Sequence, residues 1–270
     1  MPVAISTHTM QLWAASAAAT SVVLSVVLTA AADAVGWAAV APVVAAGVLI
    51  GVFVAALALR GGSSHGPADV VTLVRATLAS GCAAWVALAL AGSLPAQSWL
   101  LFVPAALAWL LDGLDGAVAR STGSASAFGA RLDAETDAAL ILVLSLAAAL
   151  VVGWWVVVAG LLRYGFVLGA RLRPGWRVPL PVSRVRKLVA ATVGGGLVVV
   201  TAPPVGTLAA VSTAVAAVGL LVWSFARDVI AIESGHIAGG VVGDVVGGPA
   251  LQRRVDPAHV LAEDPQTQQL

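Results

Sequence analysis

Residues 112 to 137 read DGLDGAVARSTGSASAFGARLDAETD, and this stretch lies where two long apolar runs meet. The runs cover about residues 98 to 120 and 130 to 152, and each is long enough to cross a bilayer. Five of the chain's 13 acidic residues fall in this one stretch. An ionised carboxylate at membrane depth is costly unless it faces a polar cavity, a partner or an ion, so these acids indicate a functional site.

The rest of the chain is similarly apolar. Hydrophobic residues make up 60% of its 270 positions and charged residues 10%, and the mean hydropathy is +1.00. We therefore predict an all-α integral membrane protein with eight transmembrane helices. The first apolar run is not preceded by Lys or Arg and is soon followed by a second, so we interpret it as a helix and not as a cleaved signal. The runs lie at about residues 10–33, 37–59, 68–92, 98–120, 130–152, 154–171, 185–202 and 205–231.

The 14 Lys and Arg residues predict the orientation of these helices, because basic residues collect in cytoplasmic loops. Four alternate connections, near residues 34–36, 93–97, 153 and 203–204, contain none of them. We therefore expect both termini and the acidic site on the cytoplasmic side. The aromatic belt of the opposite side would contain Trp37, Trp99, Trp154 and Trp155. A single cysteine, Cys82, excludes an intrachain disulfide framework and a multi-cysteine metal site.

The spacing of the acids predicts that they converge. Asp112, Asp115, Gly116 and Ala119 recur at i, i+3, i+4 and i+7, which places them on one helical face. Gly129, Asp133 and Asp137 recur every four residues on the next helix. Four carboxylates on facing helices would repel one another unless cations lie between them, and hard oxygen ligands suit Mg²⁺ or Mn²⁺. The residues alone therefore predict a metal site.

The same stretch fits the pattern D-x2-D-G-x2-A-R-x8-G-x3-D-x3-D at every fixed position, and so resembles the CDP-alcohol phosphotransferase family. The resemblance covers about residues 67 to 230 and implies a core of six helices. The expected organisation is two additional N-terminal transmembrane helices in residues 1–60, a six-helix catalytic membrane domain in residues 61–233, and a polar cytoplasmic tail in residues 234–270.

The resemblance also implies roles for individual residues. Two divalent ions, Mg²⁺ or Mn²⁺, would be held by Asp112, Asp115, Asp133 and Asp137, and Asp137 would also be the general base. Glu135 falls off the face of Asp133 and Asp137 and is expected to have no catalytic role. The nucleotide of the donor would contact Gly116, Ala119, Arg120 and Gly129.

A second segment, PADVVTLVR at residues 67 to 75, resembles a Pro-Asn-x-x-Thr-x-x-Arg segment that is frequent in the family. Asp69 stands where Asn is common. The resemblance implies that Asp69, Thr72 and Arg75 contact the donor's nucleotide and phosphates. Arg75 lies inside an apolar run and needs a partner, so a structural salt bridge with the motif acids is the alternative.

Basic residues around the connection between the sixth and seventh runs are candidates for binding a phosphorylated acceptor: Arg163, Arg171, Arg184 and Lys187. A cytoplasmic loop that meets anionic lipid headgroups is the alternative explanation. The Arg163-x7-Arg171 spacing resembles phosphatidylglycerophosphate synthases, although Tyr164 replaces the acidic residue that often follows the first arginine. A phosphatidylinositol-phosphate-type synthase and an unphosphorylated acceptor remain open.

The expected function is transfer of a substituted phosphate group, phosphatidyl above all, in phospholipid biosynthesis. The donor would be a CDP-linked lipid such as CDP-diacylglycerol, and the acceptor the hydroxyl of a small polar alcohol, with release of CMP. Membrane lipids and a second copy of the chain in a homodimer are the expected partners, and no nucleic acid is expected. A cation-coupled transporter and an intramembrane prenyl-diphosphate transferase are the alternatives. A transport site is expected at the midplane, and a prenyl transferase usually has two Asp-rich motifs.

Overall fold

The computed structural model is all-helical and describes residues 5–59, 65–121, 127–173 and 184–234, except the side chains of Leu59, 114–121, Ala127, Ala170 and Arg184. Every predicted apolar run coincides with a helix in this described part. The elements are α1 (Thr7–Ala31), α2 (Trp37–Leu59), α3 (Pro67–Leu90), α4 (Trp99–Ser121), α5 (Ala127–Val152), the 3-10 turn η1 (Trp154–Val157), α6 (Val158–Leu172), α7 (Arg184–Val200) and α8 (Thr207–Glu233).

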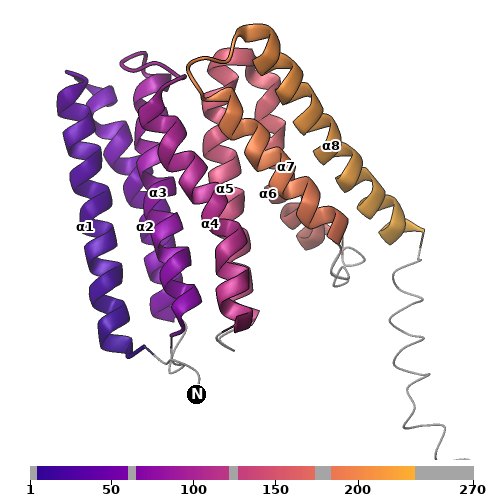
Figure 1. The fold of residues 1–270 in the computed structure, drawn as a ribbon, viewed down its shortest axis with the longest axis horizontal. Helices are drawn as coiled ribbons and strands as arrows, with labels where there is room; N and C mark the ends of the chain where they lie inside the picture. Colours follow the sequence, from indigo (N-terminus) through magenta and orange to yellow (C-terminus); the bar gives the residue numbers. More distant parts are fainter. Residues whose placement is uncertain (1–4, 60–64, 122–126, 174–183, 235–270) are drawn as a thin grey trace, which may run out of the picture. The chain divides into compact units, whose positions relative to one another are not determined.

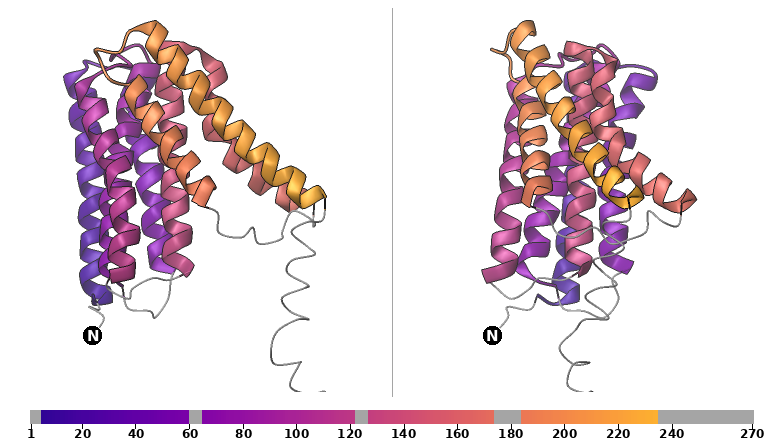
Figure 2. Two further views of the ribbon diagram at one scale, coloured as in Figure 1. Left: turned by 45° about the vertical axis from the view of Figure 1, so that its right-hand side comes forward. Right: turned by 90° about the vertical axis from the view of Figure 1, so that its right-hand side faces the viewer.

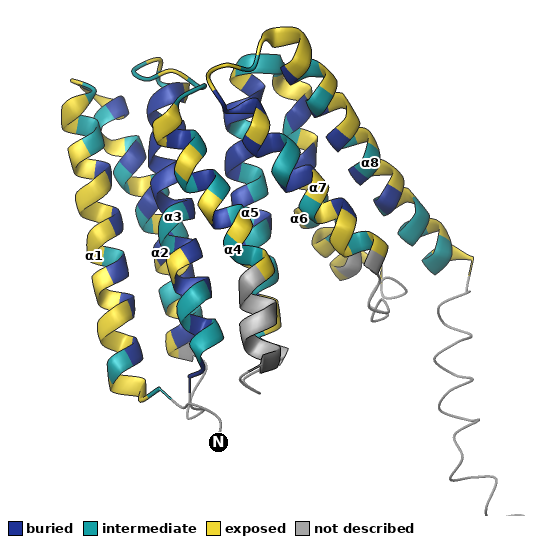
Figure 3. Cartoon of the chain, in the orientation of Figure 1, coloured by how far each residue is buried: buried dark blue, intermediate teal, exposed yellow. Residues whose placement is uncertain are grey.

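Five of these helices, α1, α2, α3, α5 and α8, are long and apolar enough to cross a membrane. Two shorter apolar segments add to them: Trp99–Gly113 in α4, and Trp154–Gly169, which joins η1 to most of α6. Exposed residues run along α1 (Figure 3). They include large apolar side chains such as Val23 and Val27. Such a surface suits a lipid environment. The total of eight transmembrane helices stays a prediction.

The chain divides into two compact units. The first contains Met1–Val167 and Ser183–Phe225, and in it α1 to α5 run in alternating directions (Figures 1 and 2). The second contains Leu168–Val182 and Ala226–Leu270, and its described residues are the last turns of α6 and α8. Those turns are joined by an ion pair between Arg173 Nη1 and Glu233 Oε1 at 3.2 Å. The predicted domain boundaries at residues 60 and 233 stay predictions.

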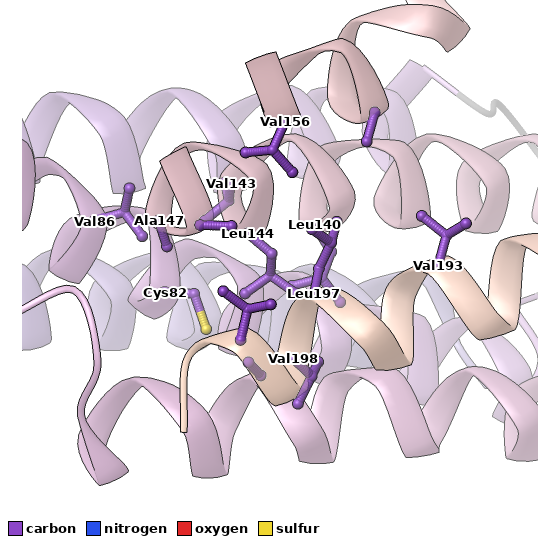
Figure 4. Close-up of a cluster of buried hydrophobic side chains, with 14 of the residues drawn as sticks. Cys82, Val86, Leu140, Val143, Leu144, Ala147, Val156, Val193, Leu197 and Val198 are labelled. Carbon is purple, nitrogen blue, oxygen red and sulfur yellow. The ribbon is translucent and has the colours of Figure 1, made fainter. Parts of the chain in front are cut away.

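Helix α3 is central in the first unit, because it packs against α1, α2, α4 and α5. A large core cluster joins α3, α4, α5, α7 and α8 through side chains such as Cys82, Leu144 and Leu197 (Figure 4). A second core cluster, with Met10, Phe53, Leu73 and Leu132 among its members, joins α1 and α2 to α3 and α5. The N-terminal pair is therefore packed directly on the helices that carry the candidate site.

Local sequence signals explain where α3 begins and where α3 and α5 end. Pro67 opens α3, and the Asp69 carboxylate accepts a hydrogen bond from the Gly66 N–H at 2.8 Å, which caps the helix start. Gly92, with φ of 77°, ends the helix in a conformation that disfavours other residues. Gly153, with φ of 105°, separates α5 from η1 in the same way. Arg75 lies near the start of α3, Asp112 near the end of α4 and Asp133 near the start of α5, so the alternating helix directions bring these residues to the same end of the unit (Figure 1).

Candidate metal centre

Three of the four motif aspartates meet in the structure. Asp112 comes from α4, and Asp133 and Asp137 come from successive turns of α5. One carboxylate oxygen of each lies within 4.8 Å of the others, a grouping that could hold a metal ion. About a third of each side chain is exposed, so the cluster is open on one side. The predicted convergence of α4 and α5 on a common acidic site therefore agrees with the geometry.

Arg75 lies at the centre of this cluster and is 1% exposed. Its guanidinium forms an ion pair with Asp112 at 3.0 Å and donates hydrogen bonds to Asp133 and Asp137. Its Nε donates to the carbonyl oxygen of Ala108 on α4 at 3.2 Å. A planar guanidinium with donors on both edges can bridge several carboxylates in this way. Of the two roles considered for Arg75, the salt bridge to the motif acids is the one that the structure contains.

The charge of the cluster fits a divalent cation. One guanidinium balances one of the three carboxylates, which leaves two negative charges when all three are ionised. The available ligand atoms are carboxylate oxygens, the hard donors that Mg²⁺ and Mn²⁺ prefer. Asp112, Asp133 and Asp137 can thus hold a metal ion. The fourth predicted ligand, Asp115, lies one turn further along α4, where side chains are outside the described residues.

A small cavity of about 30 Å³ adjoins the aspartates between α4, α5 and α7. It is lined by Asp112, Asp137 and Trp109 among others, and has room for about one water molecule. The Trp109 indole donates to the Ala191 carbonyl on α7 at 2.9 Å and lies against Gly195, where a Cβ would come within 2.9 Å of the ring. Trp109 was not predicted as a site residue, although its position three residues before Asp112 places it on the same helical face.

The predicted nucleotide contacts are only partly described. Gly116, Ala119 and Arg120 lie in the last turns of α4, with side chains outside the described residues, and Gly129 lies in the first turn of α5. Asp69 and Thr72 share a face of α3 with Arg75, as expected, but both are buried. Asp69 caps its own helix and lies 3.7 Å from His65 Nδ1, and the Thr72 hydroxyl donates to the Ala68 carbonyl. A contact of either with a nucleotide stays a prediction.

Arg163 of α6 forms an ion pair with Glu135 of α5 at 2.5 Å. The spacing of Glu135 along α5 correctly excluded it from the aspartate face, but did not indicate this partner. Arg163 is 38% exposed, and its Nε is buried without a hydrogen-bond partner among the described residues. Of the other acceptor candidates, Lys187 is exposed, Arg171 belongs to the second unit, and the Arg184 side chain lies outside the described residues. Acceptor binding by these residues stays a prediction.

Comparison with known proteins gives the family. The model of the CDP-alcohol phosphatidyltransferase family matches residues 66–226, which is more than half of the 270-residue chain. The protein therefore belongs to the CDP-alcohol phosphatidyltransferase family, as the motif predicted. No curated protein and no solved structure gives a significant match.

Family membership supports several general conclusions about this protein. The chain is an integral membrane protein, and its family transfers a phosphatidyl group from a CDP-linked donor to an alcohol among membrane lipids. The family typically uses a divalent metal, which agrees with the aspartate cluster. Among the functions considered from the sequence, family membership favours a CDP-alcohol phosphatidyltransferase over a transporter or a prenyl-diphosphate transferase.

Proposed function

We propose that the protein transfers a phosphatidyl group from CDP-diacylglycerol or a closely similar CDP-lipid to the hydroxyl of a small polar alcohol, in phospholipid biosynthesis. The proposal rests on the cluster that Asp112, Asp133 and Asp137 form around Arg75. This cluster lies inside residues 66–226, which the family model matches. The three carboxylates can bind a divalent metal ion. Because the site lies at one end of apolar helices, the donor's acyl chains would remain in lipid while its polar head reaches the site.

The reaction needs one bond to form and one to break. The acceptor oxygen attacks the phosphorus that carries the diacylglycerol, and the bond from that phosphorus to the bridging oxygen breaks, so CMP leaves with the bonding electrons. When bound, divalent metal supplies charge neutralisation of the diphosphate and polarisation of the reacting phosphorus. We assign it to Asp112, Asp115, Asp133 and Asp137, and we propose two ions, Mg²⁺ or Mn²⁺.

Asp137 is our candidate for the base that takes the proton of the acceptor hydroxyl. It is the motif aspartate that lies deepest along α5, and it lines the cavity of about 30 Å³ together with Trp109. A general base needs hydrogen-bond reach to the attacking hydroxyl, and the cavity leaves room for a group of about the size of one water molecule beside this carboxylate. Arg75 orients the same carboxylate by donating a hydrogen bond to it.

For the acceptor we propose a phosphorylated alcohol, with Arg163 as its contact. The side chain of Arg163 is 38% exposed, and this supports the assignment because its guanidinium can donate charge-assisted hydrogen bonds to an anionic ligand. Arg171, Arg184 and Lys187 remain further candidates. A cytoplasmic site, cytoplasmic termini and a homodimer complete the proposal, and they rest on the charge pattern and on the family.

The test is CMP release by the purified protein with CDP-diacylglycerol and Mg²⁺ or Mn²⁺. The acceptor panel would contain glycerol phosphate, inositol phosphate, glycerol, inositol and serine. We expect release that one acceptor stimulates and that EDTA abolishes, and the product would identify the acceptor. CMP release that is unaffected by metal removal would contradict the metal assignment, and no release with any acceptor would contradict the donor or acceptor class.

A further inference from the structure

An apolar groove of about 760 Å³ runs along α3 and α5, two of the helices that carry the candidate metal centre, in the first unit. Its walls are α2, α3 and α5, with Tyr164 of α6 at one edge. All its lining residues are apolar except Glu135, Thr136 and Tyr164. Metal binding does not require such a long apolar surface. We therefore expect the groove to bind an apolar ligand or the apolar part of one.

The groove begins at the level of the aspartates. Its lining includes Ala76, which follows Arg75 on α3, and Thr136, which precedes Asp137 on α5. From there it continues along α3 to Leu90, about 21 Å away at the helical rise of 1.5 Å per residue. Half of a bilayer's hydrocarbon core is about 15 Å thick. The groove is therefore long enough to follow a lipid chain through one leaflet from the site.

The groove is also open to the side. Val44, Val48 and Val52 of α2 line it at intervals of one helical turn and are 54%, 60% and 67% exposed. In a helix long and apolar enough to span the membrane, these exposed side chains face lipid. An apolar chain can thus enter laterally, while its polar end remains next to Glu135 and Thr136, at the level of the aspartates along α5.

We propose that this groove binds an acyl chain of the CDP-lipid donor, and that α2 thereby takes part in donor binding. The inference rests on the proposed function, and it gives the N-terminal helices a role although they precede the matched region, residues 66–226. The occupant is an amphiphile because the groove is apolar along its length and polar only at Glu135, Thr136 and Tyr164. A second copy of the chain would place apolar side chains along the groove but would bring no phosphate to its polar end.

Groove-filling substitutions test the proposal. Val48→Trp on α2 and Ala87→Phe on α3 add bulk inside the groove, far from the aspartates. The matched control is Val40→Trp, on the same helix at 59% exposure and outside the groove. With a long-chain CDP-diacylglycerol, overpacking predicts a loss of kcat/KM of about tenfold or more in the two groove variants. With dihexanoyl CDP-diacylglycerol, whose chains are too short to follow the groove, the loss should disappear, and Val40→Trp should match the wild type with both donors.

A second measurement is independent of turnover. CDP-diacylglycerol with a diazirine near the end of one acyl chain should label α2 between Val44 and Ala56, and long-chain CDP-diacylglycerol should compete better than phosphatidylcholine. Labelling elsewhere only, equal competition by both lipids, or cross-links to a second copy would overturn the groove assignment. Equal losses with long and short donors in stably folded variants would overturn it as well. If label enters α2 but the wild type releases no CMP, the proposed function fails while the groove stands as a CDP-lipid site.

Discussion

Arg75 is the most completely buried charged side chain among the described residues. It comes from α3, yet its partners lie on α4 and α5, so one side chain ties together the helices that carry the site. A buried cation with three carboxylate partners stabilises their close approach, and removal of such a cation leaves uncompensated charge. This contact makes Arg75 a positioning residue for the aspartates, while a contact with the donor's phosphates stays a prediction.

Arg75→Gln should therefore lower the free energy of unfolding in EDTA by about 3 to 5 kcal/mol, the usual cost of breaking a buried ion pair. Divalent metal should restore more stability to this variant than to the wild type, because a bound cation replaces part of the lost charge. Thermal unfolding of the detergent-purified proteins, with and without Mn²⁺, measures both effects. Arg131→Gln, at an exposed position of α5, is the control. An unchanged melting temperature for Arg75→Gln would show that the ion pairs do not stabilise the unit.

Asp133→Asn should reduce CMP release by more than about 100-fold, because a metal ligand becomes a neutral amide that binds Mg²⁺ poorly. Asp33→Asn is the control, since it makes the same change at an exposed position between α1 and α2, outside the aspartate cluster. The assay is CMP release at saturating donor, with folding checked by size-exclusion chromatography. Normal turnover in Asp133→Asn would remove this residue from the metal site.

Arg163→Ala should raise KM for a phosphorylated acceptor by about tenfold or more, the worth of one charge-assisted hydrogen bond, and leave KM for the CDP-lipid little changed. The structure suggests a control that the sequence did not, because Arg163 also pairs with Glu135. If Arg163 acts only through that ion pair, Glu135→Gln should show the same kinetics. Identical acceptor KM values in the two variants would therefore argue against direct acceptor binding.

At the scale of elements, α6 can approach α5 closely because residue 160 of α6 is a glycine. A Cβ at Gly160 would come within 2.6 Å of the Leu142 backbone and 2.7 Å of the Ser145 hydroxyl on α5. Real Cβ contacts are never this short against backbone, so the two helices are in contact at this point. Small residues serve the same purpose in many membrane helix pairs, where packing takes the place of the hydrophobic effect.

Gly160→Ala should accordingly destabilise the protein by about 1 to 3 kcal/mol, since α6 must move away from α5. Gly165→Ala on the same helix is the control, because nothing lies within 4 Å of the added Cβ, and it should be neutral or slightly stabilising. Thermal unfolding of both variants in the same detergent compares them. Equal melting temperatures would mean that α5 and α6 are further apart than the structure shows.

At the scale of the whole molecule, orientation follows from charge. The connections that contain Lys and Arg alternate with those that do not, and this predicts that both termini lie in the cytoplasm. A reporter fused after residue 270 should therefore register as cytoplasmic, and one fused after Ala96 as lying on the opposite side. Paired cytoplasmic and extracytoplasmic reporters measure this. An extracytoplasmic reading at residue 270 would contradict the predicted cytoplasmic C-terminus.

The sequence by itself determined the helices, their membrane character, the family and the acidic face of each motif helix. These follow from local signals: apolar length, the period of 3.6 residues, and a motif whose fixed spacings place Asp133 and Asp137 on one face. Only the tertiary structure decided which charged side chains form ion pairs with each other and which helices line the apolar groove. The meeting of Arg75 with the aspartates, the pairing of Glu135 with Arg163 and the groove between α2, α3 and α5 join segments far apart in the chain. Lipid-facing and buried apolar residues look alike in sequence, so the choice of neighbour depends on packing that no local pattern records.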